Sequence, residues 1–360
     1  MDTPALHLLV PFVLPPAAEA AALVAGLELP ALEKLLARAS LTDHHAPADP
    51  FQHTLPHERW LARTFGLTES GDQTPLAPYM LLADGGVPGE RTWFCAQPVH
   101  IHIARDHLVL TDPSDLELNA QDAAALHAAA LPLIAGDAAL LAPSGTRPAR
   151  WYLADDALGA LHTTSLLRAC GHNIDIWMPS GDGARAWLKL QNEIQMTWFD
   201  HPVNARREAL GLPPVNSVWL YGGGRLASAD GPGRHLAAVH SENPATRGLA
   251  LHHSIPVGTP ADDCPSPTTW PAGTTLVELG ELAGHFVRQD WARWRDALVR
   301  LENAWFAPAL AQLEQGDLAR LSLTLCGDTQ QVTLLARRGD LRKFWRRGPL
   351  ASRLAGLSAI

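Results

Sequence analysis

The stretch between His201 and Arg225 concentrates the residues whose types and spacing could do chemistry. In order, it contains His201-Pro202-Val203-Asn204, Arg207, Gly211, Pro213-Pro214, Asn216, Val218-Trp219-Leu220 and Gly222-Gly223-Gly224. Proline removes a backbone donor and glycine permits conformations that side chains block, so the pattern predicts a loop, a short helical turn, a buried strand and a tight turn. We expect Asn204, Arg207 and Asn216 to converge at one end of a sheet, where open α/β sheets place ligand sites.

Two interpretations of this stretch are open. In the first, the prolines and glycines form a rigid connection, Arg207 is solvated, and the asparagines cap turns. In the second, the stretch is an anion or phosphate site, because glycine turns expose backbone N–H groups and an arginine fork binds phosphate oxygens.

Length and composition limit the elements that can position such a site. The 360 residues predict two domains, or one large domain with an insertion, in a globular protein. The net charge of -9 argues against general nucleic-acid or anionic-membrane binding by the whole chain. The four cysteines contain no Cys-x-x-Cys pair, so we expect reduced thiols and not a zinc site: Cys95, Cys170, Cys264 and Cys326.

The amino terminus gives no sign of targeting. Residues 1–4 lack basic side chains, and the apolar run at 8–14 is short and contains Pro11. This pattern argues against a signal peptide or a membrane-spanning helix, so we expect a cytoplasmic bacterial protein without a membrane partner.

Apolar runs alternate with helical patterns along the chain, which predicts an α/β sheet. Strand patterns lie at 8–14, 93–110 (two strands), 150–153, 218–220, 236–239, 275–279 and 321–325. Helical patterns lie at 17–26, 30–39, 58–65, 120–131 with Asn119 as its cap, 165–170, 183–199 and 286–307, where Pro308 is expected to end or kink the helix. Residues 42–57 are expected to be loop, and 74–91 a crossing between domains.

Histidines and basic residues form three further patterns. His44, His45, His53 and His57 match no metal-ligand spacing, whereas His100 and His102 share one face of a strand, either exposed or holding a metal. Residues 337–347 carry Arg337, Arg338, Arg342, Lys343, Arg346 and Arg347 around Phe344 and Trp345. This segment is either a solvated amphipathic helix or a site that binds phosphate and stacks bases.

The motif from His201 to Gly224 resembles a signature of archaeal-type cofactor-independent phosphoglycerate mutases. It is also similar to a bacterial group of RpfE-type regulatory proteins. Residues 30–35 look like the family's early helix, 93–123 resemble its inserted domain, and Arg150 falls where that domain tends to carry arginine. The resemblance implies an α/β fold: an alkaline-phosphatase-like sheet flanked by helices, with an inserted smaller α/β domain. It divides the chain into a core (1–85 and 226–347), an inserted domain (86–225) and a tail (348–360).

Enzymes of that family use two divalent ions and a hydroxyl nucleophile that accepts the phosphoryl group. Residues 281–285 resemble the Asp-x-x-Gly-His of a metal site, and 326–328 resemble the strand that leads to an Asp-His metal pair. The chain departs from the pattern at most functional positions. It has Pro11-Phe12 for Asp-Gly, His57 for the nucleophilic serine, Glu281 for aspartate, Thr329 for histidine, and Tyr221 for a phosphate-binding arginine.

The loss of these ligands favours a pseudoenzyme with a regulatory or binding role, because two adjacent cations need several anionic ligands. We expect no catalytic residue, no metal and no cofactor. The expected ligand-binding residues are His201, Asn204, Arg207, Asn216 and Arg150, and the partner is an unknown protein or a phosphorylated small molecule. One alternative is an active metal-dependent phosphomutase or phosphatase with a rearranged site near His53 and His57. Another is a nucleic-acid-associated accessory protein that uses the basic C-terminal segment.

Overall fold

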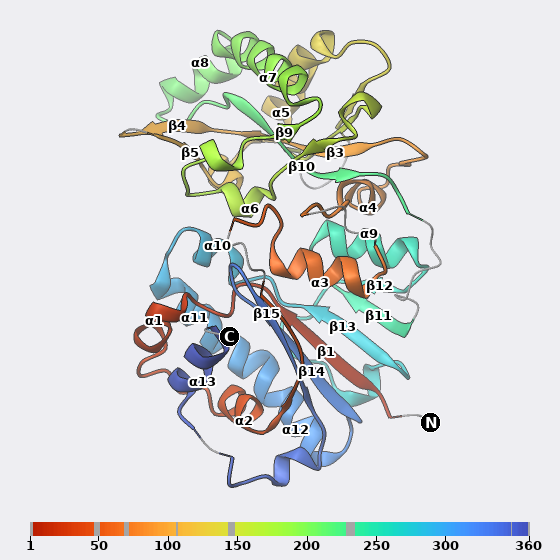
Figure 1. The fold of residues 1–360 in the computed structure, drawn as a ribbon, viewed down its shortest axis with the longest axis vertical. Coiled ribbons are helices and arrows are strands. Elements are labelled where there is room, and N and C mark those ends of the chain that lie inside the picture. Colours follow the sequence, from red (N-terminus) through yellow and green to blue (C-terminus); the bar gives the residue numbers. More distant parts are fainter. Residues whose placement is uncertain are drawn as a thin grey trace. The chain divides into compact units, whose positions relative to one another are not determined.

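The chain forms two compact units. The computed structural model describes residues 3–46, 51–67, 72–105, 107–142, 148–227, 235–346 and 348–358. Unit 1 comprises Met1–Gly66 and Asp230–Ile360, and unit 2 comprises Leu67–Ala229 (Figure 1). Unit 2 thus begins and ends at other residues than the inserted domain expected at 86–225. Helix α4 (Ala77–Ala83), expected as part of a crossing, packs on two strands of unit 2, and the segment expected to be a tail contains helix α13 (Leu350–Ser358), which packs in unit 1.

Unit 1 is built on a seven-stranded sheet of order β12-β11-β13-β1-β14-β15-β2. The strands are β1 (Ala5–Val10), β2 (Ser40–His45), β11 (Leu236–His240), β12 (Val257–Gly258), β13 (Thr274–Glu278), β14 (Arg320–Cys326) and β15 (Gln331–Ala336). The first five strands in the sheet order are parallel, and β15 pairs antiparallel with both β14 and β2. The central strands are buried almost throughout, as continuous apolar runs require when helices cover both faces.

Helices flank this sheet (Figure 1). They are α1 (Ala17–Leu23), α2 (Pro30–Arg38), α3 (Pro56–Thr64), α9 (Pro244–His252), α10 (Ala283–Val287), α11 (Trp291–Leu301), α12 (Ala307–Gln315) and α13. The expectation of a loop over 42–57 is wrong at both ends, since it contains most of β2 and the start of α3. β2 is a polar, largely exposed edge strand whose ladder partners on β15 lie far away in sequence, so no apolar pattern marks it.

The long helix does not end at Pro308, which was one of the two expected outcomes, but its regular hydrogen-bonding pattern is interrupted just before the proline. A π-helical turn at Glu302–Phe306 joins α11 to α12. Proline cannot donate to the carbonyl four residues earlier, and that carbonyl, on Ala304, accepts from the Cys264 backbone N–H at 2.8 Å instead. The turn also places the buried Glu302 carboxylate against the start of α2, where it accepts from Ala31 N (2.6 Å) and Leu32 N (3.0 Å).

Unit 2 contains a smaller antiparallel sheet of order β10-β3-β7-β6. These strands are β3 (Trp93–Val99), β6 (Ala139–Leu141), β7 (Trp151–Ala154) and β10 (Ser217–Gly224). Two further antiparallel pairs are β4 (Ile101–Ala104) with β5 (His107–Leu110), and β8 (Leu161–His162) with β9 (Ser180–Gly181). The segment 93–110 therefore holds three strands and not two. The helices are α4, α5 (Ala120–Ala130), α6 (Leu166–Ala169), α7 (Ala184–Phe199) and α8 (Pro202–Ala209).

The observed architecture confirms the expected α/β class: a mixed central sheet flanked by helices, with a smaller second sheet. Asn119 caps α5 as expected, because its side chain accepts from Asp122 N. The thiols of Cys95, Cys170 and Cys326 are buried, and Cys264 is partly buried. Among the described residues, helices that are both long and apolar enough to cross a membrane are absent.

Candidate functional site

The carboxyl ends of β1, β13 and β14 meet at one edge of the unit 1 sheet, because the three strands are parallel neighbours. Phe12 follows β1 at this edge. Its backbone adopts a left-handed conformation (φ 59°), which is unfavourable for an aromatic residue, and its side chain is only 2% exposed. The carbonyl oxygen of Phe12 accepts from Trp294 Nε1 at 2.9 Å, so a buried indole of α11 holds the turn.

Phe12 belongs to a chain of ring contacts at this edge, which we call the aromatic cluster: Phe12, His57, Phe286, Trp291 and Trp294. The Phe12 ring lies 5.0 Å from Phe286 and 5.6 Å, edge-on, from His57. The contacts continue from Phe286 to Trp291 (5.4 Å) and on to Trp294 (6.1 Å). These side chains supply one imidazole and no carboxylate, so the cluster favours packing over cation binding.

The acidic residue of the 281–285 motif has a cationic partner already. Glu281 forms an ion pair with Arg300 at 3.4 Å. The Glu281 side chain is 40% exposed and the Arg300 side chain is 57% exposed. Partial burial raises the pKa of the Glu281 carboxyl, and Arg300 and His285 oppose that shift. No group of three or more His, Cys, Asp or Glu side chains within the described ranges could hold a metal ion. The donor set there does not fit the two divalent ions that the resemblance implies.

A buried carboxylate that the sequence analysis did not single out lies at the end of β13. Glu278, 5% exposed, accepts from Ser241 Oγ (2.7 Å), Thr246 Oγ1 (2.5 Å) and Asn243 Nδ2 (3.0 Å). Three neutral donors around one buried carboxylate tie β13 to the start of α9. The available signal was an acidic residue at the last position of an apolar strand, a placement that requires hydrogen-bond partners.

In unit 2, the residues of the central motif do come together, but their polar atoms bind the main chain. His201 caps α8, with Nδ1 accepting from Val203 N at 3.2 Å. Asn204, 2% exposed, donates to the carbonyls of Trp198 (2.8 Å) and Val215 (2.9 Å) and accepts from Val215 N (2.8 Å). The short helical turn expected before Gly211 is the end of a longer helix, α8. The side chains of Val203, Asn204 and Arg207 lie on the buried face of this helix.

Arg207 and Asn216 make the same kind of contact. Arg207, 2% exposed, donates through Nε to the Pro213 carbonyl (2.9 Å) and through Nη2 to the Leu116 carbonyl (2.6 Å). Asn216 accepts from Ile101 N and donates to Ile101 O, both at 2.8 Å. The first interpretation held that Arg207 is solvated, and this is wrong because the side chain is buried. These contacts favour a loop-bracing role for the motif, and its ligand-binding role stays a prediction.

Arg150 lies in a partly buried polar network next to β7, close enough to interact electrostatically with Tyr221 of β10. Its Nε and Nη2 donate to the two carboxylate oxygens of Asp84 at 2.7 and 2.5 Å, which is a bidentate ion pair. Tyr152 also donates to Asp84, at 2.7 Å. Tyr221, at the position where the family has arginine, is a phenol whose pKa burial raises well above its ordinary value, so it is neutral.

The glycine triplet allows close packing. A Cβ on Gly222 would lie 3.1 Å from Ala77 N, one on Gly223 would lie 2.2 Å from the Phe94 ring, and one on Gly224 would lie 2.3 Å from Pro75 Cβ. Gly222 also has a positive φ of 66°. The triplet thus lets β10 approach the start of α4 and the Phe94 ring, which accounts for these glycines without a phosphate.

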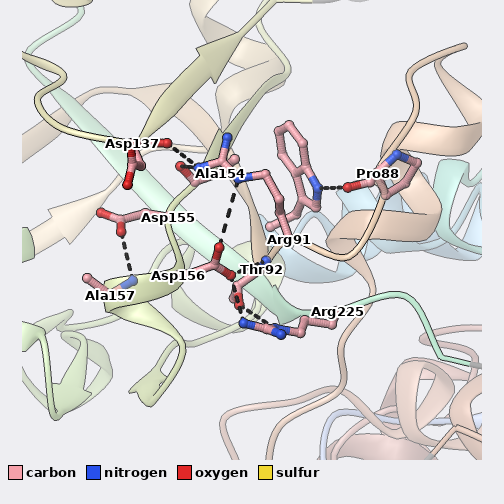
Figure 2. Close-up of polar contacts among 10 residues, drawn as sticks. Pro88, Arg91, Thr92, Asp137, Ala154, Asp155, Asp156, Ala157 and Arg225 are labelled. Carbon is pink, nitrogen blue, oxygen red and sulfur yellow. Dashed lines mark hydrogen bonds and ion pairs between the residues drawn. The ribbon is translucent and has the colours of Figure 1, made fainter.

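The strand exit after the glycines leads to a compact ion-pair network (Figure 2). Arg225 donates to Thr92 Oγ1 (3.0 Å) and to Asp156 Oδ1 (2.9 Å), and Arg91 lies 3.9 Å from the other Asp156 oxygen. The Thr92 backbone N–H, followed by the Thr92 hydroxyl and the two arginines, lowers the pKa of Asp156. Asp156 therefore interacts with both nearby guanidinium groups, and its single negative charge offsets half of their positive charge.

His100 and His102 lie on one face, as expected from the alternation. Their rings stack with centroids 5.8 Å apart, and His100 Nδ1 is 2.8 Å from the Pro214 carbonyl. A third ligand for a metal is absent near them in the part of the chain that the structure describes.

Short stretches of the chain are similar in sequence to known proteins. No family model matches the chain. It is 34% identical over 84 residues to a "Probable 2,3-bisphosphoglycerate-independent phosphoglycerate mutase" of Geobacter sulfurreducens, which is 22% of this chain and 21% of that protein. It is 37% identical over 58 residues to a 2,3-bisphosphoglycerate-independent phosphoglycerate mutase of Methanothrix thermoacetophila, which is 16% of this chain and 15% of that protein. The matches thus span about a fifth or less of the curated relatives' length.

Solved structures resemble the whole chain. The PH0037 protein from Pyrococcus horikoshii aligns with a TM-score of 0.55 and 13% identity over 99% of this chain and 92% of that one, so the two share a fold. A cofactor-independent phosphoglycerate mutase from Thermoplasma acidophilum aligns over 99% of this chain and 98% of that one, with a TM-score of 0.47 and 15% identity.

Proposed function

We propose that this chain is a phosphoglycerate mutase-like protein that does not transfer phosphate. It acts by binding a protein partner or a phosphorylated small molecule in the cytoplasm of a bacterium, in the manner of a regulatory protein. The local identity to the two mutases supports the mutase-like part of this assignment. The regulatory part rests on the resemblance of the motif from His201 to Gly224 to RpfE-type proteins. The observation that carries the proposal is the aromatic cluster at the carboxyl edge of β1, β13 and β14.

The physical argument concerns charge. Two divalent cations a few ångströms apart repel strongly, and carboxylates must offset that repulsion. After β1, the chain has Pro11-Phe12 where the mutase pattern has Asp-Gly, so a proline replaces the aspartate and the buried ring of Phe12 replaces the glycine. The Glu281 carboxylate is paired with Arg300, so its charge is already compensated. The Glu278 carboxylate at the end of β13 is already hydrogen-bonded to three neutral donors. These side chains do not form an anionic ligand set for two metal ions, so we expect no metal-assisted phosphoryl transfer at this edge.

Metal analysis and enzyme kinetics test the proposal together. Purified protein, loaded with Mn²⁺, Mg²⁺ or Zn²⁺ and then desalted, is analysed by mass spectrometry for retained metal. The same sample is assayed for conversion of 3-phosphoglycerate to 2-phosphoglycerate beside an authentic cofactor-independent mutase. We expect substoichiometric metal and no turnover. Two retained ions per chain with turnover that a chelator abolishes would contradict the proposal.

A matched pair of variants separates a rearranged active site from trace contamination. If weak turnover is seen, the variant His57→Ala removes the imidazole that stands at the nucleophile position. The control His240→Ala changes a histidine at the end of another parallel strand. Loss of turnover in His57→Ala alone would favour the active-enzyme alternative. Equal turnover in both variants and the parent chain identifies a contaminant, in agreement with the proposal.

A further inference from the structure

A basic and aromatic surface lies after the last strand of unit 1, on residues 337–346. Phe344 and Trp345 are 63% and 68% exposed, and their rings meet edge-on at 5.4 Å. The proposed mutase-like scaffold does not require two adjacent exposed aromatic side chains, because an exposed ring loses the stabilisation that burial gives. The two exposed rings therefore indicate a binding surface.

The backbone of this segment is anchored, so its side chains are held outward. Leu341 is 8% exposed, and its carbonyl accepts a hydrogen bond from Arg38 of α2. Asp340 accepts from the Arg337 backbone N–H at 3.0 Å and pairs with Lys343 at 2.6 Å. The segment is thus a short 3₁₀ turn followed by tight turns, and the solvated terminal helix considered from the sequence does not form over the described residues 337–346.

The charges on this surface are available to a ligand. Arg338, Arg342 and Arg346 are exposed, and none of the three forms an ion pair within the described part of the chain. The single carboxylate of the segment, Asp340, is compensated by Lys343. These exposed arginines belong to the same short segment as the two rings, on a chain whose overall charge is -9.

We propose that residues 337–346 form a binding site for single-stranded nucleic acid, in which Phe344 and Trp345 stack on bases and the arginines contact phosphates. Every base has a face that can stack on an aromatic ring, and guanidinium forks match phosphate oxygens. An anionic membrane is the less favoured occupant, because the segment is a turn and lacks the continuous apolar face of an interfacial helix.

Fluorescence anisotropy of a labelled oligothymidylate, titrated with the full chain at several salt concentrations, tests this site. Three arginine contacts predict that the logarithm of the affinity falls with the logarithm of salt with a slope of about -2. The variants Phe344→Ala and Trp345→Ala should each weaken binding by about 5- to 150-fold, the range measured for the loss of base stacking. Arg338→Gln and Arg342→Gln should each reduce the slope by about 0.7.

Matched controls lie in unit 2. Phe199→Ala removes a ring that is 79% exposed, and Arg185→Gln removes an exposed arginine. Both should bind as the parent chain does, and circular dichroism should show that all variants are folded. Absence of binding, equal losses in the controls, or equally tight binding of duplex DNA of the same length would overturn the proposal. Binding to phosphatidylserine vesicles in place of the oligonucleotide would overturn it too.

Discussion

Asn204 and Arg207 show how a polar motif can be structural. Each lies 2% exposed on α8, and each hydrogen-bonds main-chain carbonyls of the loop before β10. Buried loop carbonyls need partners, because an unsatisfied buried polar group destabilises the fold by about 1–3 kcal/mol. An asparagine and an arginine at these positions supply donors that neighbouring strands do not.

Two adjacent arginines of α8 provide a test at the residue scale. Arg207→Ala should lower the free energy of unfolding by about 2–4 kcal/mol, because it leaves the Pro213 and Leu116 carbonyls without their donor. Arg206→Ala is the control. Its side chain is 56% exposed and pairs with Asp122, so we expect a change of about 1 kcal/mol or less.

Urea denaturation followed by tryptophan fluorescence measures both changes. If Arg207→Ala were as stable as Arg206→Ala and instead lost affinity for 3-phosphoglycerate, the residue would be a ligand contact and not a brace. Residue type and spacing mark Arg207 as a candidate site residue. They do not tell which groups its guanidinium contacts, because Leu116 lies 91 positions away.

At the scale of elements, the π turn between α11 and α12 explains why a proline stands inside a long helix. In a regular helix, Pro308 would leave the Ala304 carbonyl without its donor and would clash with it. Here Cys264 N–H fills that role, and the extra residue in the turn makes room for the ring. The local sequence predicts that Pro308 ends or kinks the helix, and the distant loop at Cys264 allows the helix to continue.

Replacing this proline is expected to change the free energy of unfolding in an unusual direction. Pro308→Ala should not stabilise the protein, although a strained proline in a helix interior would release about 3 kcal/mol on replacement. We expect a loss of about 0.4–1 kcal/mol, because alanine gives the unfolded chain more freedom. The control Ala311→Pro, near the middle of α12, should cost about 3 kcal/mol or more. Thermal and urea unfolding decide the sign, and a stabilised Pro308→Ala variant would contradict this account.

The whole molecule consists of two units with separate cores. Unit 2 has its own buried cluster, which includes Trp151, Trp187 and Trp198 together with apolar residues of α5 and β10. Because unit 2 is one continuous segment with a packed core, it meets the conditions for an independently folding domain.

Expression of residues 67–229 alone tests this property. We expect a soluble fragment that unfolds in one cooperative transition and shows near-ultraviolet circular dichroism from its buried tryptophans. The control variant Trp198→Ala, which removes a fully buried ring, should lower the stability of the same fragment by about 3–5 kcal/mol. A fragment with far-ultraviolet but no near-ultraviolet signal would mean that the core does not pack by itself.

The sequence by itself determined the class of fold, the cap at Asn119 and the loss of the expected metal ligands. Alternating apolar and helical patterns are local, and residue identity alone decides whether a carboxylate is present at a position. Tertiary structure decided what the special residues do. It placed Phe12 against Phe286, which lies far from it in sequence, and gave Asn216 a partner 115 positions away. Such partners depend on how distant segments pack, and local spacing carries no information about that packing.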